Sequence, residues 1–171
     1  TMDHRGPDSD GTWTDGPVGF SHRRLAIIDL STAGHQPMAN ETGDVIIVYN
    51  GELYNFKTLR TELQAAGHRF RSQSDTEVII HAYEEWGEAC LDRFNGHFAF
   101  TLWDGRKKRL FLARDRFGVK PLYYFNDGAK FLFGSEIKAI LAYPGVRRGV
   151  CYPALSEYFK FQNILTDLTL F

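Results

Sequence analysis

The sequence of 171 residues has few of the features that mark several large classes of protein. It contains only two cysteines, Cys90 and Cys151, and their spacing fits neither a disulfide framework nor a set of metal ligands. Its six histidines are scattered, with no histidine or cysteine partner at ligand spacing, so a metal site is not expected. So few cysteines indicate a reducing, cytoplasmic setting.

Charge and hydrophobicity argue against two further kinds of partner. The formal net charge is −1, which leaves no excess of positive charge for nucleic acid or an anionic membrane. No apolar run is long enough to span a bilayer, and the first residues do not have the pattern of a signal peptide. Aromatic residues make up 15% of the chain, which favours a core rich in β-sheet.

Residues 45–55 (VIIVYNGELYN) form the segment around which the rest of the chain is expected to be organised. Four consecutive β-branched residues at its start predict a short strand that is buried on both faces. The pair Asn50-Gly51 accepts positive φ and predicts a sharp turn at the end of this strand. Two interpretations follow: the pair is the tip of a β-hairpin, or it is a corner that presents an amide, a backbone N–H and the Glu52 carboxylate to a ligand.

The segments before this strand predict mostly loop. Residues 1–16 are rich in Asp, Gly, Thr and Pro, which is typical of a loop. Residues 18–29 predict a strand whose apolar end, residues 25–28, is buried. Residues 30–42 predict a long connection to the central strand.

Two helices are expected after the central strand. Residues 56–66 carry a helical stripe of apolar side chains, and Gly67 is expected to end this helix. Ser74 and Glu77 match the N-cap and N3 positions of a capping box, which predicts a second helix from there to about Phe94. The side chains expected to face inward from it are Val78, Ala82, Trp86 and Ala89.

The rest of the chain changes to an apolar pattern of period two. Four antiparallel strands, joined partly by Asp-Gly hairpins, are expected at residues 98–104, 109–115, 121–127 and 129–135. Ser135 is expected to cap a short helix that Pro144 stops. Two helices between two groups of strands indicate an α+β sandwich, with stacked sheets inside and helices outside.

Six motifs in one order resemble a single family. They are HRGPD (4–8), SHRRLAIIDLSTAGHQPM (21–38), YNGELYN (49–55), SDTEVI (74–79), FNGHFAF (94–100) and RDRFGVKPLYY (114–124). Together they resemble the glutaminase domain of glutamine-dependent asparagine synthetases, which are class II glutamine amidotransferases. The resemblance covers essentially the whole chain. It implies the four-layer αββα sandwich of the N-terminal-nucleophile hydrolases, and hydrolysis of the glutamine side-chain amide to glutamate and ammonia.

The resemblance also implies a set of residues that bind glutamine. Arg24 stands at the position that binds the α-carboxylate, for which a planar and permanently charged guanidinium is suited. Glu52 and Asp75 stand at the positions that bind the α-ammonium. Asp75 has a second interpretation, because a carboxylate in the first turn of a helix is favourable through the helix dipole without any ligand. The pocket is otherwise expected to be lined by the backbone of Leu25, Ala26, Ile27 and Ile28.

In this family the tetrahedral intermediate is stabilised by the side-chain amide of Asn50 and the backbone N–H of Gly51, as the resemblance places them. The nucleophile is a cysteine at the mature N-terminus, whose own α-amine takes the thiol proton. That cysteine would precede His4 by a few tens of residues, and these 171 residues do not contain it. We therefore expect the first strand with its nucleophile to be missing and the chain as it stands to be inactive.

Three residues could stand in for the missing nucleophile. Thr1 lies directly against the HRGPD motif in an expected loop, with no strand to hold it at Asn50-Gly51, and is rejected. Cys90 is expected to be a small core residue of the second helix. Cys151 lies near the end of the chain and does not match the position of the nucleophile.

The resemblance sets the expected domains and partners. Residues 1–146 would form an N-terminally incomplete glutaminase domain, and residues 147–171 a linker toward a missing ATP-dependent synthetase domain. L-Glutamine is the expected substrate, no cofactor is expected in this domain, and ATP and Mg are expected only in the missing one. A homodimer is left open. No nucleic acid or membrane partner is expected.

Three questions stay open from the sequence. Arg114, Asp115 and Arg116 form either a structural ion-pair network or a contact to the missing domain. The chain could instead be the glutaminase half of another class II enzyme, such as a phosphoribosylamine or glucosamine-phosphate synthase. It could also be a non-catalytic glutamine-binding or scaffold module that has lost its nucleophile.

Overall fold

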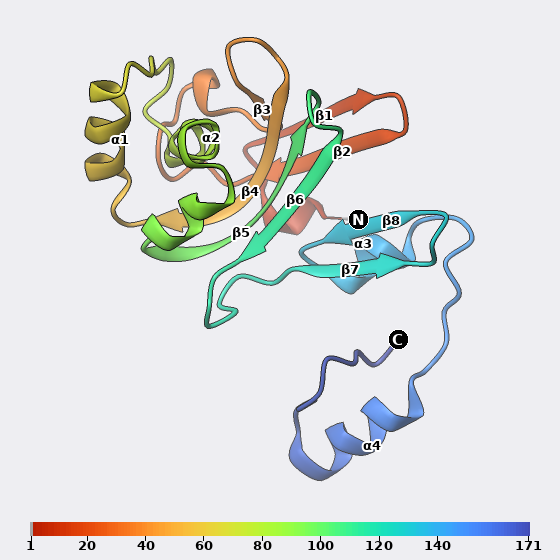
Figure 1. The fold of residues 1–171 in the computed structure, drawn as a ribbon. Coiled ribbons are helices and arrows are strands. Elements are labelled where there is room, and N and C mark those ends of the chain that lie inside the picture. Colours follow the sequence, from red (N-terminus) through yellow and green to blue (C-terminus); the bar gives the residue numbers. More distant parts are fainter. Residues whose placement is uncertain (1) are drawn as a thin grey trace. The chain divides into compact units, whose positions relative to one another are not determined.

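The computed structural model describes residues 2–171, and Thr1, the alternative nucleophile considered above, lies outside the described residues. The chain divides into two compact units, one that ends at Tyr123 and one that comprises Tyr124–Phe171. Figure 1 shows the elements of each unit. Within residues 2–171, no helix combines the length and the apolar character needed to cross a membrane. The domain boundary predicted at residue 146 stays a prediction.

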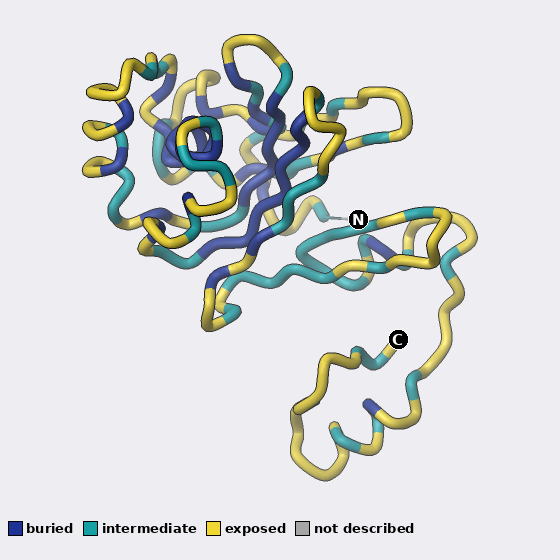
Figure 2. The backbone as a smooth tube through the Cα atoms, viewed as in Figure 1, coloured by how far each residue is buried: buried dark blue, intermediate teal, exposed yellow. Residues whose placement is uncertain are grey.

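The first unit is built on a four-stranded antiparallel sheet in the order β3-β4-β5-β6. Its strands are β3 (Met38–Ala39), β4 (Val45–Leu53), β5 (Gly96–Asp104) and β6 (Arg109–Arg114). The two central strands pair over their full length, from Val45 opposite Asp104 to Leu53 opposite Gly96. Figure 2 shows both strands buried along most of their length. The prediction of a strand at residues 45–48 that is buried on both faces is confirmed.

The turn predicted at Asn50-Gly51 is wrong, so the pair is neither the tip of a hairpin nor a corner at the end of the strand. Strand β4 continues through both residues, with Asn50 opposite Ala99 and Gly51 opposite Phe98. Position 51 requires glycine because the neighbouring strand leaves no space for a side chain. A Cβ added there would overlap the backbone oxygen of His97 and lie 2.8 Å from the Cα of Phe98. Asn-Gly therefore marks a close approach of two backbones here.

Two helices, α1 (Phe56–Ala65) and α2 (Asp75–Trp86), cover one face of this sheet (Figure 1). Helix α1 matches its prediction, and Gly67 follows it with φ of +102°. Helix α2 is shorter than predicted, because a 3₁₀ segment, η3 (Gly87–Arg93), replaces its expected end. Ala89 of η3 is exposed, contrary to the prediction, whereas Cys90 is fully buried as predicted.

The capping box predicted at the start of α2 is half correct. The Ser74 hydroxyl caps the helix by accepting a hydrogen bond from the Thr76 N–H. The Glu77 carboxylate does not complete the box at Ser74. It accepts hydrogen bonds from the N–H groups of Arg71 (2.8 Å) and Ser72 (2.7 Å). The loop before the helix therefore folds back over the first turn, and its backbone N–H groups bind the Glu77 carboxylate.

A hairpin of β1 (Ser9–Asp15) and β2 (Val18–Arg24) forms the third layer of this unit. Trp103 lies on the sheet face away from the helices, and its Nε1–H donates to the carboxylate of Asp15 at 3.3 Å. The prediction of a loop over residues 1–16 is wrong for β1. That strand has almost no apolar side chains and is held by pairing with β2, which a hydrophobic pattern does not reveal. Two short 3₁₀ segments, η1 (Asp3–Arg5) and η2 (Thr32–Gly34), lie before and after the hairpin.

The buried apolar strand end predicted at residues 25–28 is also wrong. Strand β2 ends at Arg24, and the side chains of Leu25 and Ile27 are 56% and 71% exposed. The Arg24 side chain turns inward instead, and the following segment bends around it with its apolar side chains outward.

The second unit contains β7 (Tyr123–Asn126, which begins at the boundary), β8 (Phe131–Gly134), α3 (Ile137–Leu141) and α4 (Tyr152–Phe161). Strands β7 and β8 form a hairpin whose turn at Asp127-Gly128 matches the prediction, with Gly128 at φ of +83°. The four strands predicted after residue 96 all exist, but they belong to two sheets. The N-cap of α3 is Glu136 and not Ser135, which was predicted.

Candidate functional site

Arg24 is a buried cation at the end of β2, with only 7% of its surface exposed. Its guanidinium donates to the backbone carbonyls of Ser31 (3.1 Å), Ile28 (3.3 Å) and Asp29. Gly34 packs against it so closely that an added Cβ would overlap Nη2. These three bonds use three of the five N–H groups of the guanidinium, which leaves two for a ligand.

Residues 25–36 surround the Arg24 side chain and are called the arginine loop below. Asp29 joins this loop to the segment before α2. Its carboxylate accepts hydrogen bonds from the N–H of Gln73 at 2.6 Å and from the N–H of Ser31 at 3.0 Å. The hydrogen bond from the Ser31 hydroxyl is the largest influence on this carboxyl. Together with the N–H of Gln73 it holds the pKa of Asp29 below its usual value. The sequence did not single out Asp29 as a site residue.

Asp75 connects the first turn of α2 to β4. Its Oδ2 accepts hydrogen bonds from the Tyr49 hydroxyl (2.9 Å) and from the Leu53 N–H (3.0 Å). These two residues lie on either side of Asn50-Gly51. Burial is the main influence on the Asp75 carboxyl and raises its pKa. Because Ser74 is the residue that caps the helix, Asp75 does more than satisfy the helix end.

Gln36 is a buried amide that ties the same elements together a second time. Its Oε1 accepts from the Tyr49 N–H at 2.7 Å, and its Nε2 donates to the Thr76 hydroxyl at 3.3 Å. The arginine loop, the end of β4 and the first turn of α2 are therefore adjacent. These are the three segments from which the sequence predicts the glutamine site.

The other predicted site residues lie in two of these segments, β4 and the arginine loop. In β4, Asn50 and Gly51 are half-buried and Glu52 is exposed. In the arginine loop, Ala26 donates its N–H to the Asp8 carboxylate at 2.8 Å. Asp8 belongs to the HRGPD motif, and its own N–H donates to the Arg24 carbonyl. The first motif therefore fixes the backbone of the loop that surrounds Arg24.

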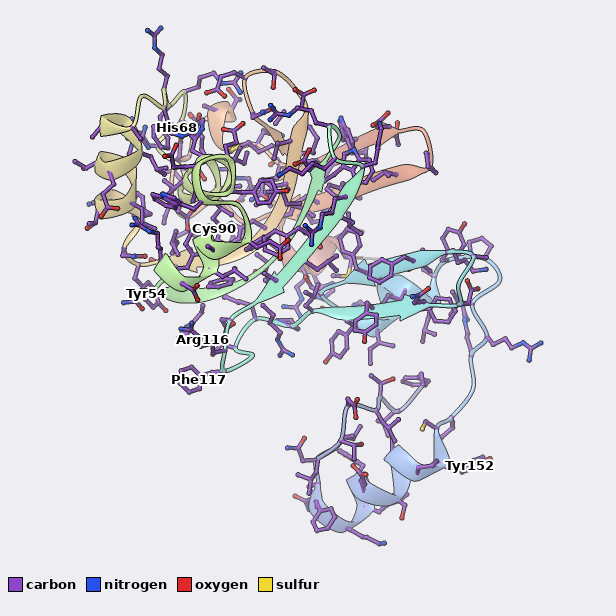
Figure 3. The ribbon with its side chains drawn as sticks, viewed as in Figure 1. Tyr54, His68, Cys90, Arg116, Phe117 and Tyr152 are labelled. Atoms are coloured by element: carbon purple, nitrogen blue, oxygen red, sulfur yellow. The ribbon has the colours of Figure 1, made fainter. Side chains whose placement is uncertain are left out.

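Asp115 organises the turn after β6. Its buried carboxylate accepts hydrogen bonds from four backbone N–H groups, those of Phe98, Phe117, Val119 and Lys120. Arg114 donates to two carbonyls of the same turn, while Arg116 is exposed. Arg114 and Asp115 therefore bond to the backbone of this turn, whereas Arg116 forms an exposed ion pair with Asp92 at 3.7 Å. A contact of this cluster to a further domain stays a prediction. Figure 3 shows Arg116 and Phe117 at the outer end of this turn.

Neither cysteine is placed as a nucleophile. Cys90 is fully buried in the core under the helices (Figure 3), and burial raises the pKa of its thiol to about 12. Such a thiol is not ionised near neutral pH. Cys151 is a half-buried, unpaired thiol in the second unit.

A second polar cluster, on α2 and the segment before it, has no counterpart in the predictions. His81 Nδ1 lies 3.0 Å from Glu84 Oε2 and 3.1 Å from His68 Nδ1. Burial lowers the pKa of His81, but the neighbouring carboxylates of Glu77 and Glu84 outweigh it and raise the pKa to about 9. The only local signal was the i, i+3 pair of His81 and Glu84, because His68 is thirteen residues away in the sequence.

Two solved structures resemble this fold. One is glutamine phosphoribosylpyrophosphate amidotransferase from B. subtilis complexed with ADP and GMP, with a TM-score of 0.60 and 24% identity. The other is described as the allosteric regulatory enzyme of purine biosynthesis, with a TM-score of 0.59 and 25% identity. Each match covers 71% of this chain and 28% of the solved chain. The structure is thus an α+β fold of the N-terminal-nucleophile hydrolase type, as predicted.

The whole chain, residues 1–171, matches the glutamine amidotransferase domain family, and it belongs to that family. Asparagine synthetase [glutamine-hydrolyzing] 3 of Bacillus subtilis (strain 168) is 53% identical over 161 residues, which cover 93% of this chain and 26% of the relative. Asparagine synthetase [glutamine-hydrolyzing] 3 of Arabidopsis thaliana is 46% identical over 162 residues, 94% of this chain and 27% of the relative. Amidase chry2 of Gibberella zeae is 43% identical over 170 residues, which cover 98% of this chain and 24% of the relative. The chain therefore spans about a quarter of the length of these relatives, and the predicted resemblance to asparagine synthetase glutaminase domains is confirmed.

Proposed function

We propose that this chain is the part of a larger glutamine-hydrolysing asparagine synthetase that binds glutamine and releases its amide as ammonia. The ammonia would pass to an ATP-dependent synthetase domain, which would amidate aspartate. ATP and Mg would bind in that domain and not in this one. Identity of 40–53% to three asparagine synthetases of B. subtilis supports this reading over the other class II enzymes, whose solved structures share 24–25%. A cytoplasmic location is part of the same proposal, and the homodimer stays an open alternative.

The observation that carries the proposal is a set of hydrogen bonds that joins the segment of a buried guanidinium to that of a buried carboxylate. Arg24 bonds to Asp29, whose carboxylate accepts from the N–H of Gln73, two residues before Asp75. Gln36 bonds to Tyr49, whose hydroxyl donates to the Asp75 carboxylate. Free glutamine carries one negative and one positive group on the same carbon. The two unused N–H groups of Arg24 suit its α-carboxylate. The Asp75 carboxylate has further acceptor capacity for its α-ammonium, and the exposed Glu52 supplies a second partner.

The oxyanion of the tetrahedral intermediate would be bound by the Asn50 side-chain amide and the Gly51 N–H. In a β-strand, alternate N–H groups point to the same edge, so the N–H of Gly51 lies on the edge of β4 where Tyr49 and Leu53 donate to Gln36 and Asp75. One such donor is typically worth about 2.7–4 kcal/mol in the barrier.

The proposal predicts that Arg24→Lys weakens glutamine binding at least about 10-fold. Lysine lacks the planar fork that can bind three carbonyls and a carboxylate together. Isothermal titration of the purified chain with L-glutamine measures the effect. The matched control is Arg23→Lys on the opposite face of β2, where the guanidinium reaches Asp3 and Asp10, and its binding should equal that of the unaltered chain.

A second variant separates binding from folding. Glu52 is exposed, so Glu52→Gln should leave thermal unfolding unchanged and still weaken glutamine binding several-fold. Unaltered glutamine affinity in both Arg24→Lys and Glu52→Gln would show that this site does not bind the amino acid by its charged ends.

We also expect the 171-residue chain to release no ammonia from glutamine above the level of its Cys90→Ala, Cys151→Ala double variant. The Cys90 thiol is buried and protonated, and Cys151 belongs to the other unit. An assay of ammonia coupled to glutamate dehydrogenase measures the rate. Turnover that the double variant loses would make one of these thiols the nucleophile and would contradict the expectation.

A further inference from the structure

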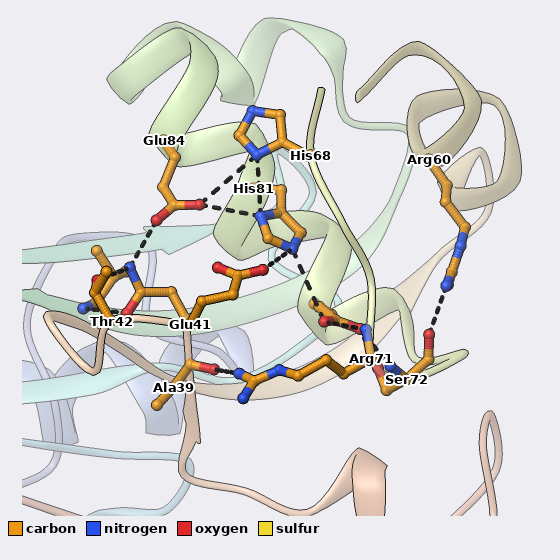
Figure 4. A network of polar contacts seen from close by, with 12 residues as sticks. Ala39, Glu41, Thr42, Arg60, His68, Arg71, Ser72, His81 and Glu84 are labelled. Atoms are coloured by element: carbon orange, nitrogen blue, oxygen red, sulfur yellow. Dashed lines mark hydrogen bonds and ion pairs between the residues drawn. The ribbon is translucent and has the colours of Figure 1, made fainter. Parts of the chain in front are cut away.

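Three potential metal ligands meet between α2 and the segment that follows α1. His81 and Glu84 are one turn apart on α2, and His68 approaches them from the loop (Figure 4). The two Nδ1 atoms lie 3.1 Å apart, and Glu84 Oε2 lies 3.0 Å from His81 Nδ1 and 3.8 Å from His68 Nδ1. The cluster is separate from the glutamine site, whose part of α2 is the first turn.

These spacings fit the face of a coordination tetrahedron. Zinc binds histidine nitrogen and carboxylate oxygen at about 2.0–2.2 Å, which places neighbouring ligand atoms about 3.3 Å apart. The three measured separations bracket this value. An ion above the three atoms would therefore need only small side-chain adjustments. The fourth position would be left for water, because His68 and Glu84 are 17% and 19% exposed.

The proposed ligands also have polar partners on the side that faces away from the cluster. His68 Nε2 lies 3.2 Å from Glu85 Oε2, which is the carboxylate–histidine arrangement that orients a metal-bound imidazole. The second carboxylate oxygen of Glu84 accepts a hydrogen bond from Asn40 Nδ2 at 2.7 Å. Both contacts leave Nδ1 of the histidine and Oε2 of the glutamate directed at the cluster.

His81 also has carboxylates near its second ring nitrogen, and that nitrogen lacks a hydrogen-bond partner. Its side chain is 2% exposed, and within the described residues its Nε2 has no hydrogen-bond partner. Glu41 Oε1 and Glu77 Oε1 lie 3.5 and 3.8 Å from that nitrogen. Glu77 is occupied by the backbone of Arg71 and Ser72, so this side of the imidazole is better suited to orienting carboxylates than to a second ion.

We propose that His68, His81 and Glu84 bind one divalent transition-metal ion, with Zn²⁺ as the best match. Two imidazoles and one carboxylate are the donors that Zn²⁺ accepts in tetrahedral geometry, whereas Mg²⁺ and Ca²⁺ take oxygen ligands. Binding breaks the Nδ1–H bond that links His81 to Glu84 and releases that proton to solvent. The ion would cross-link the loop after α1 to helix α2, and so would stabilise the helical layer.

The test is metal binding by the purified, chelator-treated chain. We expect one Zn²⁺ per chain in competition with a chromophoric chelator. Co²⁺ should give the visible absorption of a four-coordinate site. His68→Ala should weaken Zn²⁺ binding at least about 100-fold, and Glu85→Gln, which removes only the orienting carboxylate, about 10- to 100-fold. Both side chains are partly exposed, so circular dichroism should show both variants folded.

The matched control is His97→Ala. This histidine lies outside the cluster and bonds to the Tyr54 hydroxyl at 2.8 Å, so its loss should leave Zn²⁺ affinity unchanged. Absence of binding by the unaltered chain would overturn the proposal, and the cluster would then hold only a proton. Equal affinity of the unaltered chain and His68→Ala would overturn it as well, because the ion would then be bound by other residues.

Discussion

Replacing Gly51 with alanine is expected to destabilise the first unit by at least about 3 kcal/mol. The new Cβ would overlap the backbone oxygen of His97 and press on the Cα of Phe98, both in the central strand β5. A flexible side chain could move away, but these are backbone atoms of a strand that pairs on both sides. The overlap can be relieved only by separating β4 from β5, which form the middle of the core. A loss of this size is a large fraction of the 5–15 kcal/mol that usually stabilises a domain.

Urea unfolding followed by circular dichroism measures this loss. The matched control is Gly19→Ala in β2, where an added Cβ meets Thr14 Cγ2 at an ordinary 3.7 Å. Both variants replace glycine with alanine inside a strand, so the change in strand propensity is the same in both. They differ only in the space that is available to the new Cβ. We expect Gly19→Ala to unfold at or slightly above the urea midpoint of the unaltered chain. Equal midpoints for the two variants would show that β4 and β5 can separate at Gly51 without cost.

Gly51 also shows where local patterns stop being sufficient. An Asn-Gly pair after an apolar run is a strong hairpin signal because both residues tolerate positive φ. In this chain the glycine is required by another strand, β5, which lies about fifty positions along the sequence. Helix α1 was predicted correctly because its apolar stripe is local. Strand β1 was missed because its pairing with β2, and not its own side chains, makes it a strand.

The candidate site divides in the same way. Arg24, Asn50 and Asp75 could be named as candidates from the sequence because whole motifs surround them, and their roles stay predictions. Asp29 and Gln36, which bring those motifs together, bond to residues 44 and 40 positions away, and no local pattern indicates such bonds. The same is true of the contact between His68 and His81, since neither residue has a ligand partner at a recognisable spacing.

Asp115→Ala is expected to destabilise the first unit by about 3 to 5 kcal/mol. The change leaves four backbone N–H groups without their acceptor, each of which costs about 1–3 kcal/mol when it stays buried and unsatisfied. Water can reach the N–H groups in the exposed part of the turn, so the total is less than the sum. The bond to Phe98 is the most costly to lose, because Phe98 lies in β5 and belongs to the core.

The two oxygens of Asp115 accept hydrogen bonds from different pairs of N–H groups, so variants of this residue can be ranked by how many of these bonds they lose. Oδ1 accepts from Phe117 and Val119, whereas Oδ2 accepts from Phe98 and Lys120. Asp115→Asn keeps one oxygen and turns an NH₂ group toward the other pair of donors, so its loss should be about half that of Asp115→Ala.

The control for this series is Asp92→Ala. Asp92 is an exposed partner of Arg116, and its removal should change the free energy of unfolding by less than about 0.5 kcal/mol. If Asp115→Ala were no more destabilising than Asp92→Ala, the turn after β6 would be held by Arg114 and solvent, and not by the buried carboxylate.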